Sequence, residues 1–293
     1  MSSAPRWAVE RLAGSFRIEG AGRPGLSARY CCGVAKVMGV LNVTPDSFSD
    51  GGLWLDPDAA VRHGRQMVAE GADVIDVGGE STRPGARPVD LAEEMRRVLP
   101  VVEALSGEVT VSIDTRKEQV ARAAVAAGAK LVNDVSASLW QVAADSGCGW
   151  VAMHMPADPT VMASKATYDD LLGEVTSYLV ERAETARRAG VGEIWIDPGI
   201  GFAKTAAHNF SLLRHLDTIV STGWPVLVGT SRKSFLALPS GSPAGGDGER
   251  PAAERLEATV ATSTWAILKG AAMVRVHDVA PAVMAASLAG SRS

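Results

Sequence analysis

Eight short apolar runs recur along the chain, and longer amphipathic segments separate them. The runs comprise residues 37–41, 73–77, 109–113, 130–133, 150–153, 193–196, 225–229 and 273–276. Runs this short, rich in β-branched residues and without a polar face, are typical of strands buried on both faces of a parallel sheet. The segments between them predict helices over residues 57–71, 91–105, 116–128, 139–147, 168–190, 206–223, 254–270 and 278–290.

Eight strand–helix units predict an α/β fold, the closed (β/α)8 TIM barrel, with its active site at the C-terminal rim of the strands. The 293 residues suit one barrel of about 250 residues. An open doubly wound sheet is the alternative. Its dinucleotide-binding form carries a G-x-G-x-x-G loop after the first strand, whereas Asn-Val-Thr-Pro-Asp stands at residues 42–46 here.

The predicted domain boundaries leave one barrel domain over residues 36–293. Residues 1–35 read as a loosely ordered leader, in which a short hairpin could cap the barrel. Residues 238–251 are rich in Gly, Ser and Pro and predict a flexible loop. Within the helices, Pro100 is expected to break or kink the segment 91–105.

Composition excludes several classes of function. The net charge is −4 with both signs interspersed, so no nucleic-acid partner is expected. No uncharged apolar stretch of about 18 residues exists, so no membrane span is expected. Cys31, Cys32 and Cys148 have neither a zinc spacing nor a disulfide framework. Together with an N-terminus that lacks the features of a signal peptide, this favours a cytoplasmic protein.

Polar residues follow most of the predicted strands, where a barrel builds its active site. One group can accept hydrogen bonds from a flat heterocycle with an amino-pyrimidinone edge: Asp114, Asn133 and Asp197, with Lys233 as a donor. Taken singly, Asp114 or Asn133 can equally be a helix N-cap. What favours a site is that polar groups converge on most of the strand ends.

A second group of strand-end residues is cationic and suits a phosphate group: Arg83, Arg275 and His277. Arg275 and His277 are two residues apart, so on a regular strand they project to the same side. Asn42 could join them through Mg²⁺, which keeps several waters and takes few protein ligands.

Two blocks carry a resemblance to a known family. MGVLNVTPDSFSDGG (38–52) and GADVIDVGGESTRPGA (71–86) resemble the two signatures of the dihydropteroate synthases. Further blocks match in order over roughly residues 36–280, among them IDPGIGFAKT (196–205) and PVLVGTSRKSFL (225–236). Departures are small: the family commonly has a glycine within residues 136–139 and at Ala157.

The resemblance implies a transferase of folate biosynthesis. It would condense a (7,8-dihydropterin-6-yl)methyl diphosphate with 4-aminobenzoate and release 7,8-dihydropteroate and pyrophosphate by a dissociative path. It also implies Mg²⁺ as cofactor, a homodimer built on the last helices, and inhibition by sulfonamides, which mimic 4-aminobenzoate.

The resemblance also implies residue roles. Asp114, Asn133, Asp197 and Lys233 would bind the pterin, and Asn42, Thr82, Arg83, Arg275 and His277 the diphosphate, with Asn42 on the metal. Phe48, Asp50, Pro84, Phe202 and Ser234 would belong to the 4-aminobenzoate pocket and to two lid loops, residues 44–52 and 81–87. The catalytic set would be Asp114, Asp197, Lys233, Arg275 and His277.

Three rival functions stay open at this stage. Corrinoid methyltransferases that use methyltetrahydrofolate share a barrel and pterin-binding carboxylates, but they need no diphosphate site such as Arg275 and His277. A copy that binds pterins without turnover should carry changes at the residues above, and none is seen. A sulfonamide-tolerant enzyme copy is a third possibility.

Overall fold

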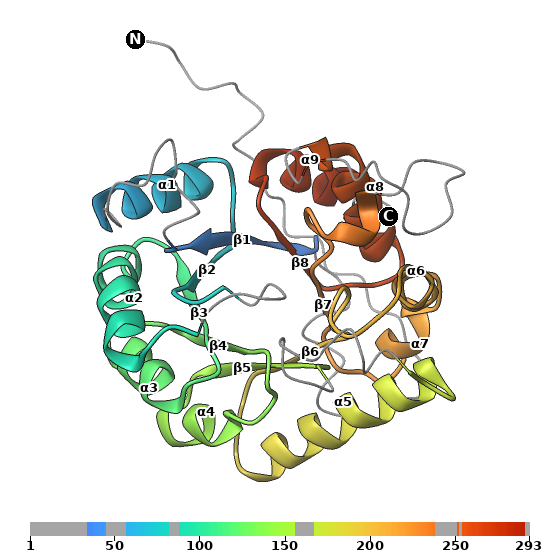
Figure 1. The fold of residues 1–293 in the computed structure, drawn as a ribbon, viewed down its shortest axis with the longest axis horizontal. Helices are drawn as coiled ribbons and strands as arrows, with labels where there is room; N and C mark the ends of the chain where they lie inside the picture. Colours follow the sequence, from blue (N-terminus) through green and yellow to red (C-terminus); the bar gives the residue numbers. More distant parts are fainter. Residues whose placement is uncertain are drawn as a thin grey trace.

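The computed structural model describes residues 34–44, 57–81, 88–155, 167–237, 251 and 254–290. Eight parallel strands form one ring with helices around its outside (Figure 1). The strands are β1 (Lys36–Asn42), β2 (Val74–Gly78), β3 (Thr110–Asp114), β4 (Leu131–Asp134), β5 (Gly149–Met153), β6 (Ile194–Asp197), β7 (Leu227–Val228) and β8 (Met273–Val276).

The strand order in the sheet is β6-β5-β4-β3-β2-β1-β8-β7. A parallel bridge between Ile196 and Val226, with a 3.0 Å hydrogen bond from the amide of Ile196 to the carbonyl of Pro225, joins the two edges of this sheet. The predicted (β/α)8 barrel is therefore confirmed, and the open doubly wound alternative is wrong.

The helices follow the predicted segments with two corrections. They are α1 (Pro57–Ala69), α2 (Leu91–Leu105), α3 (Glu118–Ala126), α4 (Trp140–Ser146), α5 (Leu171–Arg188), α6 (Ala206–Arg214), α7 (Leu216–Val220), the 3₁₀ helix η4 (Ser234–Ala237), α8 (Leu256–Leu268) and α9 (Val279–Gly290). The single helix predicted over residues 206–223 is divided at His215, whose φ of −106° and ψ of 25° are not helical. Helix α2 continues through the exposed Pro100, so the predicted break is absent.

Two apolar clusters fill the barrel. Outward-facing strand residues such as Ile75, Ile113 and Ile196 pack against the helices in a large cluster. Inward-facing residues form a separate plug: Met38, Val74, Leu131, Val151, Trp195, Leu227 and Met273. Because strand side chains alternate between faces, the same parity points later residues of each strand inward above the plug.

The strand register collects polar groups at the upper end of the barrel. Asn42 of β1 is level with Gly78 of β2, Gly78 with Asp114 of β3, and Asp114 with Asn133 of β4. Each of these positions has the inward parity of the apolar plug below it. The fold therefore brings together polar side chains that are up to 91 residues apart between Asn42 and Asn133.

The turn after β4 depends on the buried carboxylate of Asp134. It accepts hydrogen bonds from the amides of Ser136 (2.9 Å), Ser138 (2.7 Å) and Leu139 (2.6 Å), and from the indole N–H of Trp150 (3.2 Å). If the carboxylate is removed, these N–H groups stay buried without an acceptor, which costs free energy. Asp134 is thus a structural residue that holds the turn before α4 rather than part of the site.

We expect Asp134→Ala to lower the free energy of unfolding by about 3 kcal/mol or more, because several donors would lose their acceptor at about 1–3 kcal/mol each. Urea unfolding followed by circular dichroism measures this. Asp145→Ala is the matched control, since Asp145 binds Arg122 and Gln141 at the surface; it should cost less than about 1 kcal/mol. Equal effects of the two substitutions would contradict the structural role.

In the part of the chain that the structure describes, no helix is both long and apolar enough to span a membrane.

Candidate active site at the rim of the barrel

Arg275 of β8 lies at the centre of a buried ion cluster. Its Nε donates to Asp76 Oδ2 at 2.6 Å, and its Nη2 donates to Asp114 Oδ2 at 2.6 Å. The amide nitrogen of Asn133 donates to the same oxygen of Asp76 at 2.9 Å. Four inward-facing residues from four strands, β2, β3, β4 and β8, therefore form one connected network.

The opposite wall of the rim carries Asp197 and Lys233. Asp197, at the end of β6, accepts a 2.7 Å hydrogen bond from the amide of Gly199. The Lys233 ammonium donates to the carbonyl of Ile200, and its Nζ lies 4.5 Å from the centre of the Phe202 ring. Lys233 and Phe202, which belong to different βα connections, are thus neighbours.

The third side of the rim carries His277, directly after β8. Ser231, after β7, lies 3.0 Å through its Oγ from His277 Nδ1 and accepts a 3.1 Å hydrogen bond from the backbone amide of His277. This contact fixes the orientation of the imidazole beside Arg275. Ser234 is exposed at the start of η4.

Burial and the opposed charges shift the pKa values of these groups. Burial raises the pKa of Asp114 to about 7, with Asp76 acting in the same direction and Arg275 against it. Burial also raises the pKa of Asp197 and lowers that of Lys233 to about 8, and each of the two opposes the other's shift. Burial acts against the charge of Arg275, but Asp76 and Asp114 more than compensate, so its pKa is raised.

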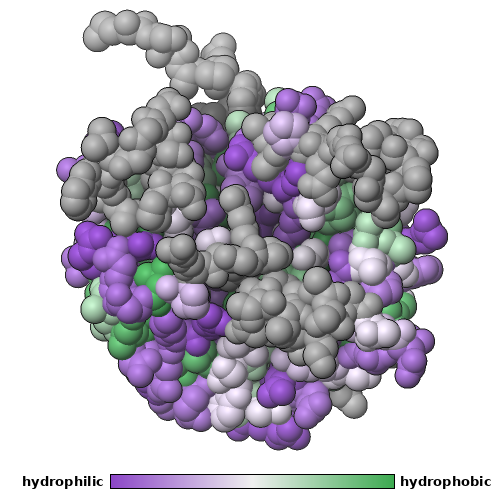
Figure 2. Space-filling model, in the orientation of Figure 1, coloured by the Kyte–Doolittle hydropathy of each residue, from purple (hydrophilic) through white to green (hydrophobic). Residues whose placement is uncertain are grey.

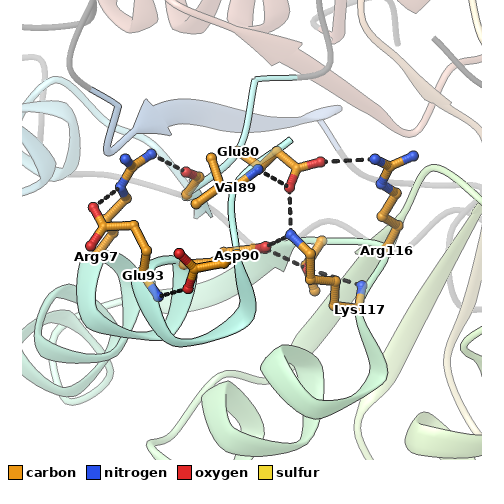
Figure 3. Close-up of polar contacts among 10 residues, drawn as sticks. Glu80, Val89, Asp90, Glu93, Arg97, Arg116 and Lys117 are labelled. Carbon is orange, nitrogen blue, oxygen red and sulfur yellow. Dashed lines mark hydrogen bonds and ion pairs between the residues drawn. The ribbon is translucent and has the colours of Figure 1, made fainter. Parts of the chain in front are cut away.

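A second ion network lies beside this rim and holds both ends of the connection between β2 and α2 (Figure 3). Glu80 accepts a 3.2 Å hydrogen bond from the amide of Val89 and pairs with Arg116 at 3.1 Å. Arg97 donates to the carbonyl of Gly79 at 2.9 Å. The residues that enter and leave this connection are therefore fixed to each other and to α2.

Lys117 joins this network to β3. Its ammonium pairs with both Glu80 and Glu94. Glu94 is buried in α2 and accepts a 2.6 Å hydrogen bond from the hydroxyl of Thr115, the residue after Asp114. The entry to the 82–87 segment and the strand end that carries Asp114 thus share one set of ionic contacts.

The structure brings together every predicted site residue that it describes: Asn42, Asp114, Asn133, Asp197, Phe202, Lys233, Ser234, Arg275 and His277 all lie at or just after the C-terminal strand ends. Phe48, Asp50, Thr82, Arg83 and Pro84 lie outside the described residues. On the face shown in Figure 2, the described surface is mostly hydrophilic, with smaller hydrophobic patches.

One feature of the predicted arrangement needs correction. The sequence suggested two separate groups, acceptors for a heterocycle and cations for a phosphate, but Arg275 is paired directly with Asp76 and Asp114. The sequence reasoning also missed Asp76, which is fully buried, and Ser231. A carboxylate at an inward-facing position inside the apolar run 73–77 was the available signal for Asp76.

The donor set fits a metal held mainly by a substrate. Among the described residues there is no group of three or more His, Cys, Asp or Glu placed to hold a metal ion. Asn42 is half-buried at the strand end, with Asn42 Oδ1 and the Asp114 side chain both flanking Gly78. One amide oxygen on the same rim as cationic side chains suits Mg²⁺, which usually completes its shell with water and substrate phosphates.

A barrel whose rim presents buried carboxylates, an amide and several cations defines a barrel enzyme that binds a small, polar molecule. Comparisons with known proteins narrow this class. The family model of the pterin binding enzymes matches residues 38–277. A dihydropteroate synthase of Mycobacterium leprae is 48% identical over 268 residues, which are 87% of this chain and 93% of the relative.

Two solved structures of dihydropteroate synthases from Xanthomonas albilineans share the fold. One, with 4-aminobenzoic acid, has a TM-score of 0.79 and 44% identity over 87% of this chain and 91% of its own. The other, in complex with 7,8-dihydropteroate, has a TM-score of 0.76 and 42% identity over 87% and 92%. The chain therefore belongs to the dihydropteroate synthase family of pterin-binding enzymes.

The raised pKa of Asp114 predicts a pH dependence of stability. Its folded value, about 7, exceeds its ordinary value of 3.8. The carboxyl group therefore contributes stability that is fully present below about pH 4 and is lost as the pH rises through 7. Asp114→Asn lacks this titration, so the stability of the wild type relative to the variant should fall between pH 5 and pH 8. Urea unfolding at both pH values measures the difference, and a difference independent of pH would contradict the assignment.

Proposed function

We propose that this chain is a dihydropteroate synthase, which joins a (7,8-dihydropterin-6-yl)methyl diphosphate to 4-aminobenzoate and releases 7,8-dihydropteroate and pyrophosphate in folate biosynthesis. The observation that carries the proposal is the single cluster in which Arg275 pairs with Asp76 and Asp114 next to Asn133. This cluster supports the proposal because it would offer acceptors to a heterocycle and a cation to a phosphate within one site.

The pterin would bind to the acceptors of the rim. Asp114, Asn133 and Asp197 offer oxygens to the N–H groups of an amino-pyrimidinone ring, and Lys233 offers a donor to its carbonyl. Two further buried atoms of the floor, Asp76 Oδ1 and Ser112 Oγ, have no hydrogen-bond partner among the described residues. Buried polar atoms normally have partners, so these two support a polar ligand or an ordered water in this cavity.

The diphosphate would bind at the side of Arg275 and His277, with Asn42 toward the metal and Thr82 and Arg83 from the neighbouring connection. Arg275 would contact the diphosphate as a cation, because its ion pairs with Asp76 and Asp114 stabilise the charged guanidinium. Mg²⁺, when bound, would supply further positive charge to the diphosphate oxygens. His277, held by Ser231, adds a hydrogen-bond donor.

The reaction itself needs charge stabilisation more than a strong base. The bond between the pterin methylene carbon and the diphosphate oxygen breaks, and its electron pair leaves with the diphosphate. The resulting cation is delocalised over the pterin, where Asp114 and Asp197 would stabilise it. The neutral amine of 4-aminobenzoate then forms the C–N bond and releases a proton. Charges that are already in place before the reaction usually contribute most to stabilisation of the transition state.

The second substrate would bind beside Phe202, Lys233 and Ser234, where a ring, a cation and an exposed hydroxyl lie together. Phe48, Asp50 and Pro84 are proposed to complete this subsite. Sulfonamides, as mimics of 4-aminobenzoate, are expected to compete for it.

The proposal predicts pyrophosphate release that depends on 4-aminobenzoate, on a divalent metal and on Arg275. EDTA should stop turnover and Mg²⁺ should restore it.

Arg275→Ala should lower kcat/KM by roughly 10²- to 10³-fold, as loss of one charge-stabilising donor does elsewhere. The control Arg122→Ala removes an exposed arginine of α3 and should leave the rates unchanged. A coupled pyrophosphate assay, with dihydropteroate identified by mass spectrometry, measures both.

The same assay separates the rival functions. A pterin-binding protein without turnover would bind 6-hydroxymethylpterin but form no dihydropteroate. A methyltransferase of the corrinoid type would not require Arg275 for a diphosphate. Either outcome would contradict the proposal.

We further propose a homodimer formed through α8 and α9, in the cytoplasm. The two helices pack on each other, and α9 carries no charged residue. Trp265, Leu268, Met284 and Leu288 are 48%, 49%, 64% and 71% exposed. A helix that is apolar all round is normally buried, and a second copy in two-fold symmetry would cover this face.

Met284→Glu is expected to convert the dimer to a monomer, because it would place a charge in the apolar contact. Sedimentation velocity measures the change. Leu91→Glu is the matched control: Leu91 is also exposed, at 37%, but lies on α2. A wild-type chain that sediments as a monomer would contradict the dimer.

A further inference from the structure

Lys204 lies behind the proposed 4-aminobenzoate subsite, in the connection between β6 and α6. Its Nζ donates to the carbonyl of Phe202 at 3.1 Å and to the carbonyl of His154 at 3.3 Å, and lies 3.0 Å from His154 Nδ1. An ammonium group has three donors, and three acceptors surround this one. Lys204 therefore links the main chain around Phe202 to the end of β5.

His154 is suited to act as an acceptor in this contact. It is buried, and its ring lies edge-on to Tyr178 at 5.1 Å between centroids. Burial lowers the pKa of His154 to about 3, with Lys204 acting in the same direction. The imidazole is therefore neutral at physiological pH, and its Nδ1 can accept a hydrogen bond from the Lys204 side chain.

The chain after β5 and the chain after β6 lie in close contact at this point. The amide of His154 donates to the carbonyl of Asp197 at 2.9 Å. Gly199 has a φ of 65°, and a Cβ at this position would lie 2.0 Å from the carbonyl oxygen of His154 and 3.4 Å from Lys204 Nζ. The backbone after Asp197 thus approaches β5 at a distance that only glycine allows, and Lys204 fills the remaining space.

Other contacts fix the neighbouring residues of the same connection. The amide of Gly201 donates to the buried Asn209 at 2.7 Å, and the carbonyl of Ala203 accepts from the hydroxyl of Tyr168 at 3.1 Å. Ala203 adopts a left-handed φ of 46°. Lys204 supplies the corresponding contact for Phe202, the residue between these two, whose ring faces Lys233.

A purely structural role does not account well for a buried lysine in this place. Burial lowers the pKa of Lys204 to about 7, although Asp197 acts in the opposite direction. Apolar residues of similar volume often stabilise a protein as well as buried charges do. What the ammonium adds is a fixed direction for two carbonyls and one imidazole next to substrate-contacting groups.

We propose that Lys204 is a positioning residue for the 4-aminobenzoate subsite: by tying the carbonyl of Phe202 to His154 at the end of β5, it fixes the Phe202 ring beside Lys233. This inference rests on the proposed function, because that function gives Phe202 its role.

The experiment compares Lys204→Met with the wild type in steady-state assays at a temperature well below both melting temperatures. Displacement of a binding group by about 1 Å can cost up to 10²-fold, so we expect at least roughly a tenfold rise in the KM for 4-aminobenzoate. Lys204→Arg, which keeps the charge and the donors, should recover part of the loss. Lys130→Met is the matched control, since Lys130 is exposed directly before β4, at the opposite end of the barrel.

The outcomes distinguish this inference from the proposed function. An inactive wild type would contradict the proposed function. An active wild type, with Lys204→Met less stable but with an unchanged KM for 4-aminobenzoate, would contradict the positioning role alone. If Lys204→Met does not fold, Lys204→Gln replaces it, because its shorter side chain, with two donors, cannot bind all three acceptors and so breaks the link between Phe202 and His154; a KM equal to that of the wild type would again overturn the proposal.

Discussion

The ion cluster of Arg275 with Asp76 and Asp114 is the interaction on which the rest of the site depends. Two carboxylates within a barrel are costly unless a cation and hydrogen bonds compensate them, and Arg275 contacts both at 2.6 Å. The same guanidinium faces the side of the rim that would hold the diphosphate. Under the proposed function, one residue would stabilise an acceptor for the pterin and supply charge to its leaving group.

The barrel positions this cluster through strand parity and through contacts behind the rim. Apolar residues close the lower part of the interior, so the polar residues of the same parity meet above them. Behind β3, Lys117, Glu80 and Glu94 hold the strand end of Asp114 and the neighbouring connection. Behind β6, Lys204 and His154 hold the main chain that follows Asp197. Both supports are polar and lie behind the rim residues that they hold.

Much of the fold and of the rim could be predicted from the sequence. All eight strands follow from apolar runs, and the strand-end positions of Asp114, Asn133 and Asp197 identified one site. The sequence could not show that Asp76 meets Arg275 across 199 residues, or that Lys204 meets His154, because such pairs depend on register and loop path. The helix break at His215 carried no Gly or Pro signal. Ala137, in a segment where the family commonly has a glycine, adopts a φ of 50° that explains the usual glycine.

A double-mutant cycle on Arg275 and Asp76 tests the central interaction most directly. Unfolding free energies would be measured for the wild type, Arg275→Met, Asp76→Asn and the double variant. Removing one partner of a buried pair typically costs about 3–5 kcal/mol. If Arg275 compensates Asp76, the double variant should lose clearly less stability than the sum of the two single variants. Additive losses would mean that the two residues do not depend on each other, which would contradict the account.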